Sequence, residues 1–220
     1  MGRSVMNKAV INTVTGLLLS LLLSLGMSAS AFAAWDEAKD LVEDATQKMV
    51  ELLSNPTLKE EEAFQELFSG VGGVLGSVVD FDRIARGVMA KHYRQANDDQ
   101  RQRFSAVFRN TLVKTYAKAL EAFDFERYEI IDNRKPSKKP NKQTVKVDVF
   151  GSNGTRYNLI YFLLNGEQGW KVTNVHLDGI NLRQIFKNQF ADAVNNRKGN
   201  IDQVIDEWAS MVEPKPEKES

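Results

Sequence analysis

The sequence predicts an α+β fold in which helices precede and follow a run of antiparallel strands. Of the 220 residues, 42% are hydrophobic and 26% are charged, which is typical of one soluble globular domain. Apolar residues recur at helical spacing before residue 123 and again after residue 181, whereas four short runs between them favour strands. We therefore expect a curled four-stranded antiparallel sheet packed with about six helices.

The first 33 residues have the features of a secretory signal peptide. Arg3 and Lys8 precede an apolar run over residues 10–27, and Ala31-Phe32-Ala33 supplies the small residues that a signal peptidase requires. Cleavage is expected after Ala33, although the run is close to the length of an uncleaved membrane anchor. The prediction is a signal peptide over 1–33, one domain over 34–212 and a disordered tail over 213–220 of an exported, soluble protein.

The composition excludes several classes of function. The chain has no cysteine, which removes disulfides, thiol catalysis and cysteine-based metal sites, and it has only two histidines. Its 29 basic and 29 acidic residues balance, so nucleic acid is not expected as a partner. We expect no cofactor and no metal.

Four helices are predicted before the strands. Asn55-Pro56 ends the first, and Asp80 and Asn97 are suitable N-caps for the third and fourth. The second contains glycines at 70, 72, 73 and 76, which indicate a break in the helix or the close approach of another backbone or a ligand. The predicted helices cover residues 35–53, 64–79, 81–89 and 98–122.

Four strands and two further helices complete the predicted fold. The second strand alternates strictly, with Val145, Val147 and Val149 on one face. The third strand is apolar on both faces, so we expect it to be covered on both sides. Turns at residues 151–154 and 165–167 favour antiparallel hairpins. The strands are predicted at 127–132, 144–150, 156–164 and 169–177, and the helices at 182–196 and 200–212.

Residues 134–142, between the first two strands, hold five positive charges among nine residues. One interpretation is a solvated hairpin loop. The other is a contact with anionic lipid headgroups or with an acidic partner protein. The candidate contact residues are Arg134, Lys135, Lys138, Lys139 and Lys142.

No catalytic arrangement is evident from the residues themselves. His92 and His176 are interpreted as structural, and Asp80 and Asp82 as residues that favour a helix start. An enzyme using Tyr157 or Tyr161 remains an alternative, although no inward-facing carboxylate is evident on the strands. The apolar faces converge on one interior, and periodicity alone leaves open whether that interior is a solid core or a cavity.

Two segments resemble the MlaC family. Asp80-Phe81-Asp82-Arg83-Ile84-Ala85, with the helix that carries Phe104, Phe108 and Tyr116, is similar to one family segment, and residues 169–182 are similar to the family's strand-to-helix passage. Gln189-Phe190 and residues 199–205 are similar to the family's C-terminal end. The resemblance extends over about residues 35–212. Asn174 and Asn181 stand where the family usually has Asp and Ser.

This resemblance implies a periplasmic phospholipid-binding protein that is not an enzyme. It implies a shape related to nuclear transport factor 2, an apolar cavity for acyl tails, and transport between an outer-membrane lipoprotein–porin complex and an inner-membrane ABC transporter that maintains lipid asymmetry. A monomer is expected. A structural adaptor with a solid core is the rival interpretation. The candidate cavity residues are Val74, Leu75, Val78, Phe81, Ile84, Val88, Phe104, Phe108, Leu112, Tyr116, Val147, Val149, Tyr157, Leu159, Tyr161, Trp170, Val172 and Phe186.

Overall fold

The computed structural model describes residues 31–59, 63–132 and 135–212. Most of the predicted signal peptide, the predicted tail over 213–220 and the candidate contact residue Arg134 lie outside these ranges. Among the described residues, no helix is both long and apolar enough to cross a membrane.

The sheet has five antiparallel strands in the order β1-β2-β3-β4-β5. The prediction of four strands is therefore wrong by one strand, because the two-residue β5 is too short to show an alternation of apolar and polar residues. The other four strands are found where they are predicted, with ends that differ by at most two residues. The strands are β1 (Phe125–Ile131), β2 (Lys142–Gly151), β3 (Arg156–Gly166), β4 (Gly169–Leu177) and β5 (Ile180–Asn181).

Helices surround the strands in the predicted order, and their caps explain where they begin. The side chains of Asp80, Asn97 and Asn181 accept hydrogen bonds from backbone N–H groups three residues further on, which satisfies donors that a helix start leaves free. The helices are 31–53, α2 (Phe64–Val78), α3 (Phe81–Met89), α4 (Asp98–Glu121), α5 (Leu182–Asn196) and α6 (Ile201–Val212), with short 3-10 turns η1 (Pro56–Lys59) and η3 (Ala90–Arg94).

The glycines of α2 do not break the helix. Two of them stand where a side chain of another helix comes close: an ideal Cβ on Gly70 would lie 2.9 Å from Leu52 Cδ2, and one on Gly76 would lie 2.8 Å from Arg109 Nη2. Gly73, in contrast, has nothing within 4 Å of its ideal Cβ. Close packing of side chains from other helices therefore explains some of these glycines, and of the two alternatives the break is absent.

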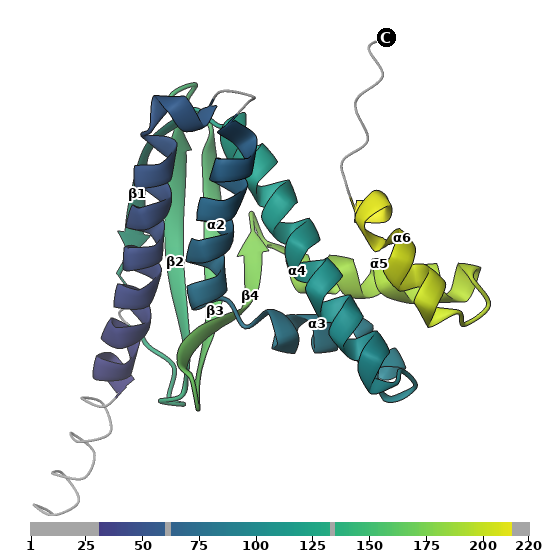
Figure 1. The fold of residues 1–220 in the computed structure, drawn as a ribbon. Coiled ribbons are helices and arrows are strands. Elements are labelled where there is room, and N and C mark those ends of the chain that lie inside the picture. The colour runs from purple at the N-terminus through teal and green to yellow at the C-terminus, as the bar shows by residue number, and fades with distance from the viewer. Residues whose placement is uncertain (1–30, 60–62, 133–134, 213–220) are drawn as a thin grey trace, which may run out of the picture.

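Helix 31–53 and α2 lie in front of the sheet in Figure 1 and cover one face of it, which we call the inner face. Ala38 and Val42 of helix 31–53 pack against Val145 and Val147 of β2. The indole Nε1 of Trp35 donates a hydrogen bond of 3.0 Å to the carbonyl oxygen of Thr144, which fixes the helix on the strand.

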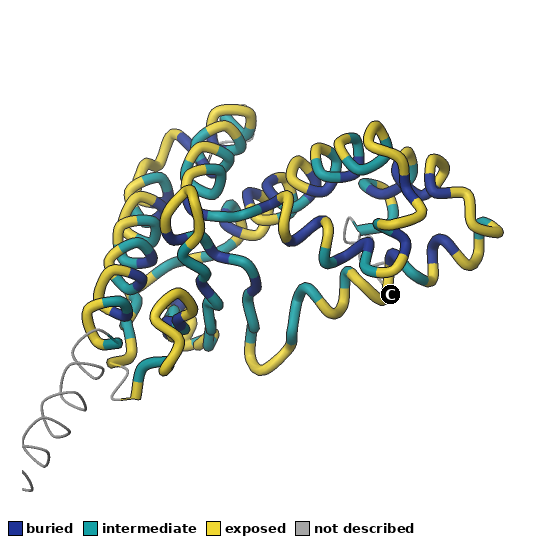
Figure 2. The backbone as a smooth tube through the Cα atoms, turned by 90° about the horizontal axis from the view of Figure 1, so that it is seen from below, coloured by how far each residue is buried: buried dark blue, intermediate teal, exposed yellow. Residues whose placement is uncertain are grey.

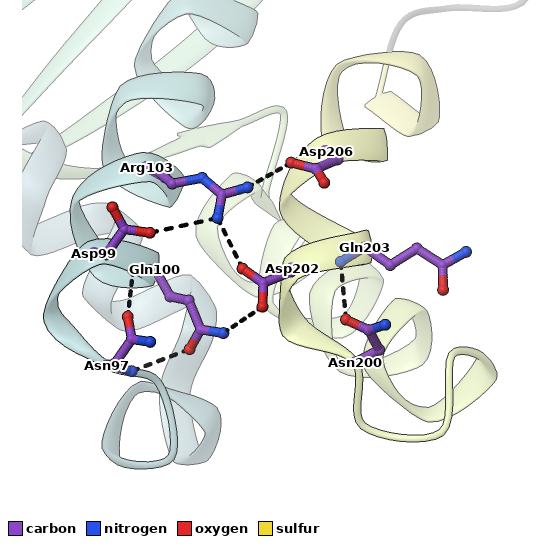
Figure 3. Close-up of polar contacts among 8 residues, drawn as sticks. All are labelled: Asn97, Asp99, Gln100, Arg103, Asn200, Asp202, Gln203 and Asp206. Atoms are coloured by element: carbon purple, nitrogen blue, oxygen red, sulfur yellow. Dashed lines mark hydrogen bonds and ion pairs between the residues drawn. The ribbon is translucent and has the colours of Figure 1, made fainter.

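A second core joins α3, α4, α5 and α6. Phe104 of α4 is fully buried, with its ring 4.7 Å from Phe190 and 5.1 Å from Trp208 in edge-to-face geometry. At the surface of this core, Arg103 of α4 forms ion pairs with Asp202 (2.8 Å) and Asp206 (2.6 Å) of α6 (Figure 3). These contacts hold the last helix against the longest one. Buried backbone occurs in both the sheet half and the helical half of the molecule (Figure 2).

Val79 and Asp80 connect the two halves. Val79 forms a parallel bridge with Val172 at the free edge of β4, and the backbone N–H of Asp80 donates a 3.0 Å hydrogen bond to the carbonyl oxygen of Val172. Val79 itself is only half-buried, although it packs against all three hydrophobic clusters found among the described residues. The interior is thus divided into three clusters that meet beside a partly open position.

The opposite face of the sheet, the outer face, is less covered than the sequence predicts. Ile160, Phe162 and Leu164 of β3 are half-buried and belong to none of the three clusters. The expectation that β3 is covered on both sides is therefore wrong for this face.

Candidate functional site

The inner face of the sheet is closed at one end and open at the other. Val145, Leu163 and Val172 are buried beneath helix 31–53. Further along the same face, Leu159 and Tyr161 are only half-buried although they are apolar or aromatic. We call this second region the open wall. It consists of Val149 on β2, Tyr157, Leu159 and Tyr161 on β3, Val175 and Leu177 on β4, and Tyr116 on α4.

Tyr116 and Tyr161 show what kind of surface the open wall is. Tyr116 keeps 38% of its surface exposed, yet the surrounding protein desolvates its hydroxyl and raises its pKa. Burial also raises the pKa of Tyr161, and the charge of a nearby Tyr116 phenolate raises it further. A side chain that is surrounded by protein and still exposed lines a concave surface. Tyr116 of α4 and Tyr161 of β3 therefore face each other across the open wall.

Helix and strand periodicity explain why these residues meet. Phe108, Leu112 and Tyr116 follow one another at intervals of four residues, so they share one side of α4. Phe108 lies in the buried helical core and Tyr116 reaches the open wall, while Leu112 packs against two clusters between them. Phe186 of α5 has its ring 5.6 Å from that of Phe108 at the edge of the helical core.

Nine of the eighteen predicted cavity residues are half-buried or exposed, and five of these belong to the open wall: Tyr116, Val149, Tyr157, Leu159 and Tyr161. Leu112 and Phe186 are half-buried and pack against the helical core. Val74 and Leu75 are also half-buried but pack with the cluster beneath α2. The remaining residues are buried among protein side chains: Val78, Phe81, Ile84, Val88, Phe104, Phe108, Val147, Trp170 and Val172. A ligand could reach these buried residues only by displacing their neighbours.

Val175 and Leu177 belong to the open wall but are not among the predicted cavity residues. A β-bulge explains the omission, because Phe162 is opposite Asn174 while Leu163 is opposite Val172, so one residue of β4 is extra. Alternation counted from Trp170 and Val172 would place Asn174 on the inner face. The sequence does contain a signal of this bulge: the apolar residues of the strand stand at even numbers up to Val172 and at odd numbers from Val175 on.

Two pockets lie away from the open wall. One, of about 520 Å³, lies between helix 31–53 and β1 and is lined by Trp35, Lys39, Glu43, Tyr128, Ile130 and Asp132. The other, of about 320 Å³, lies beside α2 and is lined by Lys48, Glu51, Leu52, Asn55, Leu58, Gly70 and Val74. Charged side chains border both pockets. Val74, at the second pocket, is the one predicted cavity residue that lines either of these two pockets.

The described residues offer little for acid–base or metal chemistry. No cluster of three or more His, Asp or Glu residues within the described ranges could hold a metal ion. Asp148 is a buried carboxylate on β2, but it is opposite Asn158 on the outer face. Its oxygens accept hydrogen bonds from Asn158 Nδ2 (2.8 Å) and Arg156 Nη2 (2.5 Å). Burial opposes ionisation of Asp148, but these two donors outweigh it and lower its pKa.

Residues 137–143 of the lysine-rich loop have a defined conformation. Lys135, Lys138 and Lys139 are exposed, whereas the side chain of Gln143 is buried beneath the loop. Gln143 Oε1 accepts a 3.0 Å hydrogen bond from the backbone N–H of Ser137, and the N–H of Lys142 donates to the carbonyl oxygen of Lys139 at 3.0 Å. The loop thus presents its lysines from a fixed turn.

Comparison with known proteins identifies relatives over most of the chain. The family model described as MlaC protein matches residues 43–210. The toluene tolerance protein Ttg2D of Pseudomonas putida is 31% identical over 174 residues, which cover 79% of this chain and 80% of the relative. A phospholipid-binding protein of Ralstonia solanacearum, solved in complex with a phospholipid, superimposes with a TM-score of 0.68 at 26% identity, covering 79% of this chain and 97% of that one.

Proposed function

The chain belongs to the MlaC family, and from this membership we propose that it binds a phospholipid and carries it through an aqueous compartment. The observation that supports the proposal is the open wall, where tyrosine and aliphatic side chains stay half-exposed between α4 and the sheet. A similar fold from Ralstonia solanacearum holds a phospholipid. We propose that the acyl tails of the lipid lie against the open wall and cover it.

The energetics of the cargo explain why such a surface is needed. Two acyl chains contain roughly 30 methylene groups, and leaving them in water would cost on the order of 25 kcal/mol. A carrier must therefore cover the tails throughout its transfer. A bilayer offers the same apolar environment, so loading from a membrane is nearly balanced and the direction of transfer must come from other proteins.

We also propose a compartment in which the protein acts and two protein complexes between which it moves. We propose that the protein acts in the periplasm after removal of residues 1–33, as a monomer. It would move phospholipids between an outer-membrane lipoprotein–porin complex and an inner-membrane ABC transporter, and thereby maintain outer-membrane lipid asymmetry. The domain over 34–212 would be the carrier. Its cargo would be the only bound group, with no cofactor.

The geometry of the site gives less support to the two rival functions, an acid–base enzyme and a structural adaptor. An acid–base enzyme needs a carboxylate or another base at the open wall, but the inner-face positions of β2, β3 and β4 carry Gln, Asn, Val, Tyr, Leu and Trp side chains. A structural adaptor has no need of half-exposed tyrosines in a concave wall. Both considerations favour a binding protein without catalytic activity.

Native mass spectrometry of the protein purified from a bacterial periplasm tests the proposal. We expect a complex heavier than the chain by the mass of a phospholipid, and organic extraction should release that lipid. A denatured sample provides the control, because it should show the chain alone. If the gentle spectrum also shows the chain alone, even after incubation with phospholipid vesicles, the adaptor interpretation replaces this one.

A further inference from the structure

We propose that the outer face of the sheet and the β1–β2 loop together form a surface that docks onto an anionic lipid bilayer. The proposal concerns the face opposite the open wall and does not depend on what the open wall binds. Three properties of this face support it: apolar side chains that are only half-buried, lysines interleaved with them, and acidic groups already neutralised by arginines.

The strand register places lysines beside apolar side chains. On the outer face, Lys142 of β2 is opposite Leu164 of β3, and Lys146 is opposite Ile160. Phe162 lies between Ile160 and Leu164, with its ring 4.5 Å from that of His176 on β4. Both lysines are exposed, whereas the three apolar residues of β3 are half-buried. The face therefore presents apolar side chains with cationic groups beside them.

The β1–β2 loop extends the positive charge past the end of the sheet. Lys138, Lys139 and Lys142 are exposed, and none of them has a carboxylate within 4.0 Å in the part of the chain that the structure describes. The hydrogen bonds between Ser137 and Gln143 hold residues 137–143 in place, so docking requires little ordering of this segment.

The acidic groups of the outer face do not cancel this charge. Asp148 is paired with Arg156 at 2.5 Å, and Glu129 is paired with Arg127 at 2.5 Å. The whole chain has equal numbers of acidic and basic residues, so the positive field here is a local excess. At the adjoining edge, Ile131 of β1 is 37% exposed and is opposite Lys146.

A bilayer is the occupant that fits these features best. Lysines near an anionic membrane surface bind its phosphates, while apolar side chains between them enter the interfacial region. An acidic protein would satisfy the lysines, but it would have to bring a matching apolar patch to cover Ile160, Phe162 and Leu164. The face is a sheet surface, and neither pocket is bordered by these three residues.

Vesicle flotation of the mature protein tests the proposal, with phosphatidylglycerol vesicles as the anionic probe and phosphatidylcholine vesicles as the neutral one. We expect at least tenfold stronger binding to the anionic vesicles, decreasing as salt rises from about 0.1 M to about 1 M. Each lysine near the surface contributes about fivefold in affinity. The combined change Lys138→Glu, Lys139→Glu and Lys142→Glu should therefore weaken binding roughly 100-fold or more.

A matched control separates local from total charge. Lys91→Glu, Lys118→Glu and Lys187→Glu make the same change in net charge at exposed positions elsewhere. This control should bind anionic vesicles within about threefold of the parent, because charges farther away than a Debye length are screened. Equal losses in the two triple variants would overturn the proposal, as would equal binding to the two kinds of vesicle.

Two further measurements identify the occupant. Binding to polyglutamate beads without binding to anionic vesicles would assign the face to an acidic protein and overturn the membrane proposal. Native mass spectrometry of the Lys138/Lys139/Lys142 variant reports its cargo separately. We expect cargo to be retained there while vesicle binding is lost, which distinguishes a failure of docking from a failure of the proposed lipid binding.

Discussion

Tyr116 of α4 and Tyr161 of β3 lie close enough for the negative charge of one phenolate to raise the pKa of the other. Burial raises the pKa of both hydroxyls, even though Tyr116 remains 38% exposed. The pair joins the longest helix to the middle strand of the sheet across the open wall. It is also the place where covering by a ligand would change the surroundings of a titratable group.

The tyrosine pair predicts a loss of stability at alkaline pH. An unfolded tyrosine ionises near about pH 10, whereas these two hydroxyls resist ionisation in the folded protein. Above that pH the unfolded state loses protons first, so the free energy of unfolding decreases as pH rises. We expect Tyr161→Phe to reduce this decrease, measured by urea unfolding between about pH 8 and pH 11. Leu159→Ala, two residues away on the same strand face and without a titratable group, is the control and should leave the decrease unchanged.

Leu159→Arg should block cargo binding while the protein remains folded. Leu159 is half-buried on the open wall, so the guanidinium of an arginine there would place a charge on this apolar surface and oppose its contact with acyl tails. The next residue, Ile160, points to the outer face, so Ile160→Arg is a control on the same strand. Native mass spectrometry should find lipid in the Ile160 variant and not in the Leu159 variant. Lipid in both would show that the open wall is not the binding surface.

The buried Asp148 predicts a change in stability at acidic pH. Its hydrogen bonds to Asn158 and Arg156 lower its pKa against the effect of burial, so its contribution is present above about pH 4 and is lost as pH falls through the lowered pKa. Asp148→Asn should cost about 1–2 kcal/mol at neutral pH, because Arg156 is 58% exposed and water screens the pair. The two proteins should converge in stability below about pH 4 in denaturant titrations. A constant difference across this range would mean that the carboxylate charge is not what stabilises the strands.

The sequence allowed the order of elements to be predicted because local rules determine it. Asp80 and Asn97 are caps whose side chains bond within their own helix, and strict alternation at Val145, Val147 and Val149 specifies one buried face. Pairing with a strand end determines β5, which has no local signal of its own. The likeness to nuclear transport factor 2 stays a prediction.

The candidate site was harder to predict because burial depends on what lies across the interior. Phe104 and Tyr116 belong to the same broad apolar stripe of α4, yet Phe104 is fully buried while Tyr116 is 38% exposed. The difference comes from Phe190 and Trp208, which lie more than 70 residues away in sequence and pack against Phe104. No periodicity within the helix contains that information.

The glycines of α2 provide a test of whether the helix must flex to admit cargo. An alanine in a helix interior is favoured over glycine by about 1 kcal/mol. Gly73 is exposed and its ideal Cβ meets nothing within 4 Å, so Gly73→Ala should stabilise the protein by about 0.5–1 kcal/mol. At Gly70 the new methyl group would lie 2.9 Å from Leu52 Cδ2, so Leu52 must move and the gain should shrink or vanish. Thermal unfolding of the two variants measures the difference, and vesicle loading of Gly73→Ala measures its consequence. If α2 acts as a rigid cover, loading should equal that of the parent, whereas a stabilised variant that loads poorly would show that bending of α2 at its glycines is part of lipid entry.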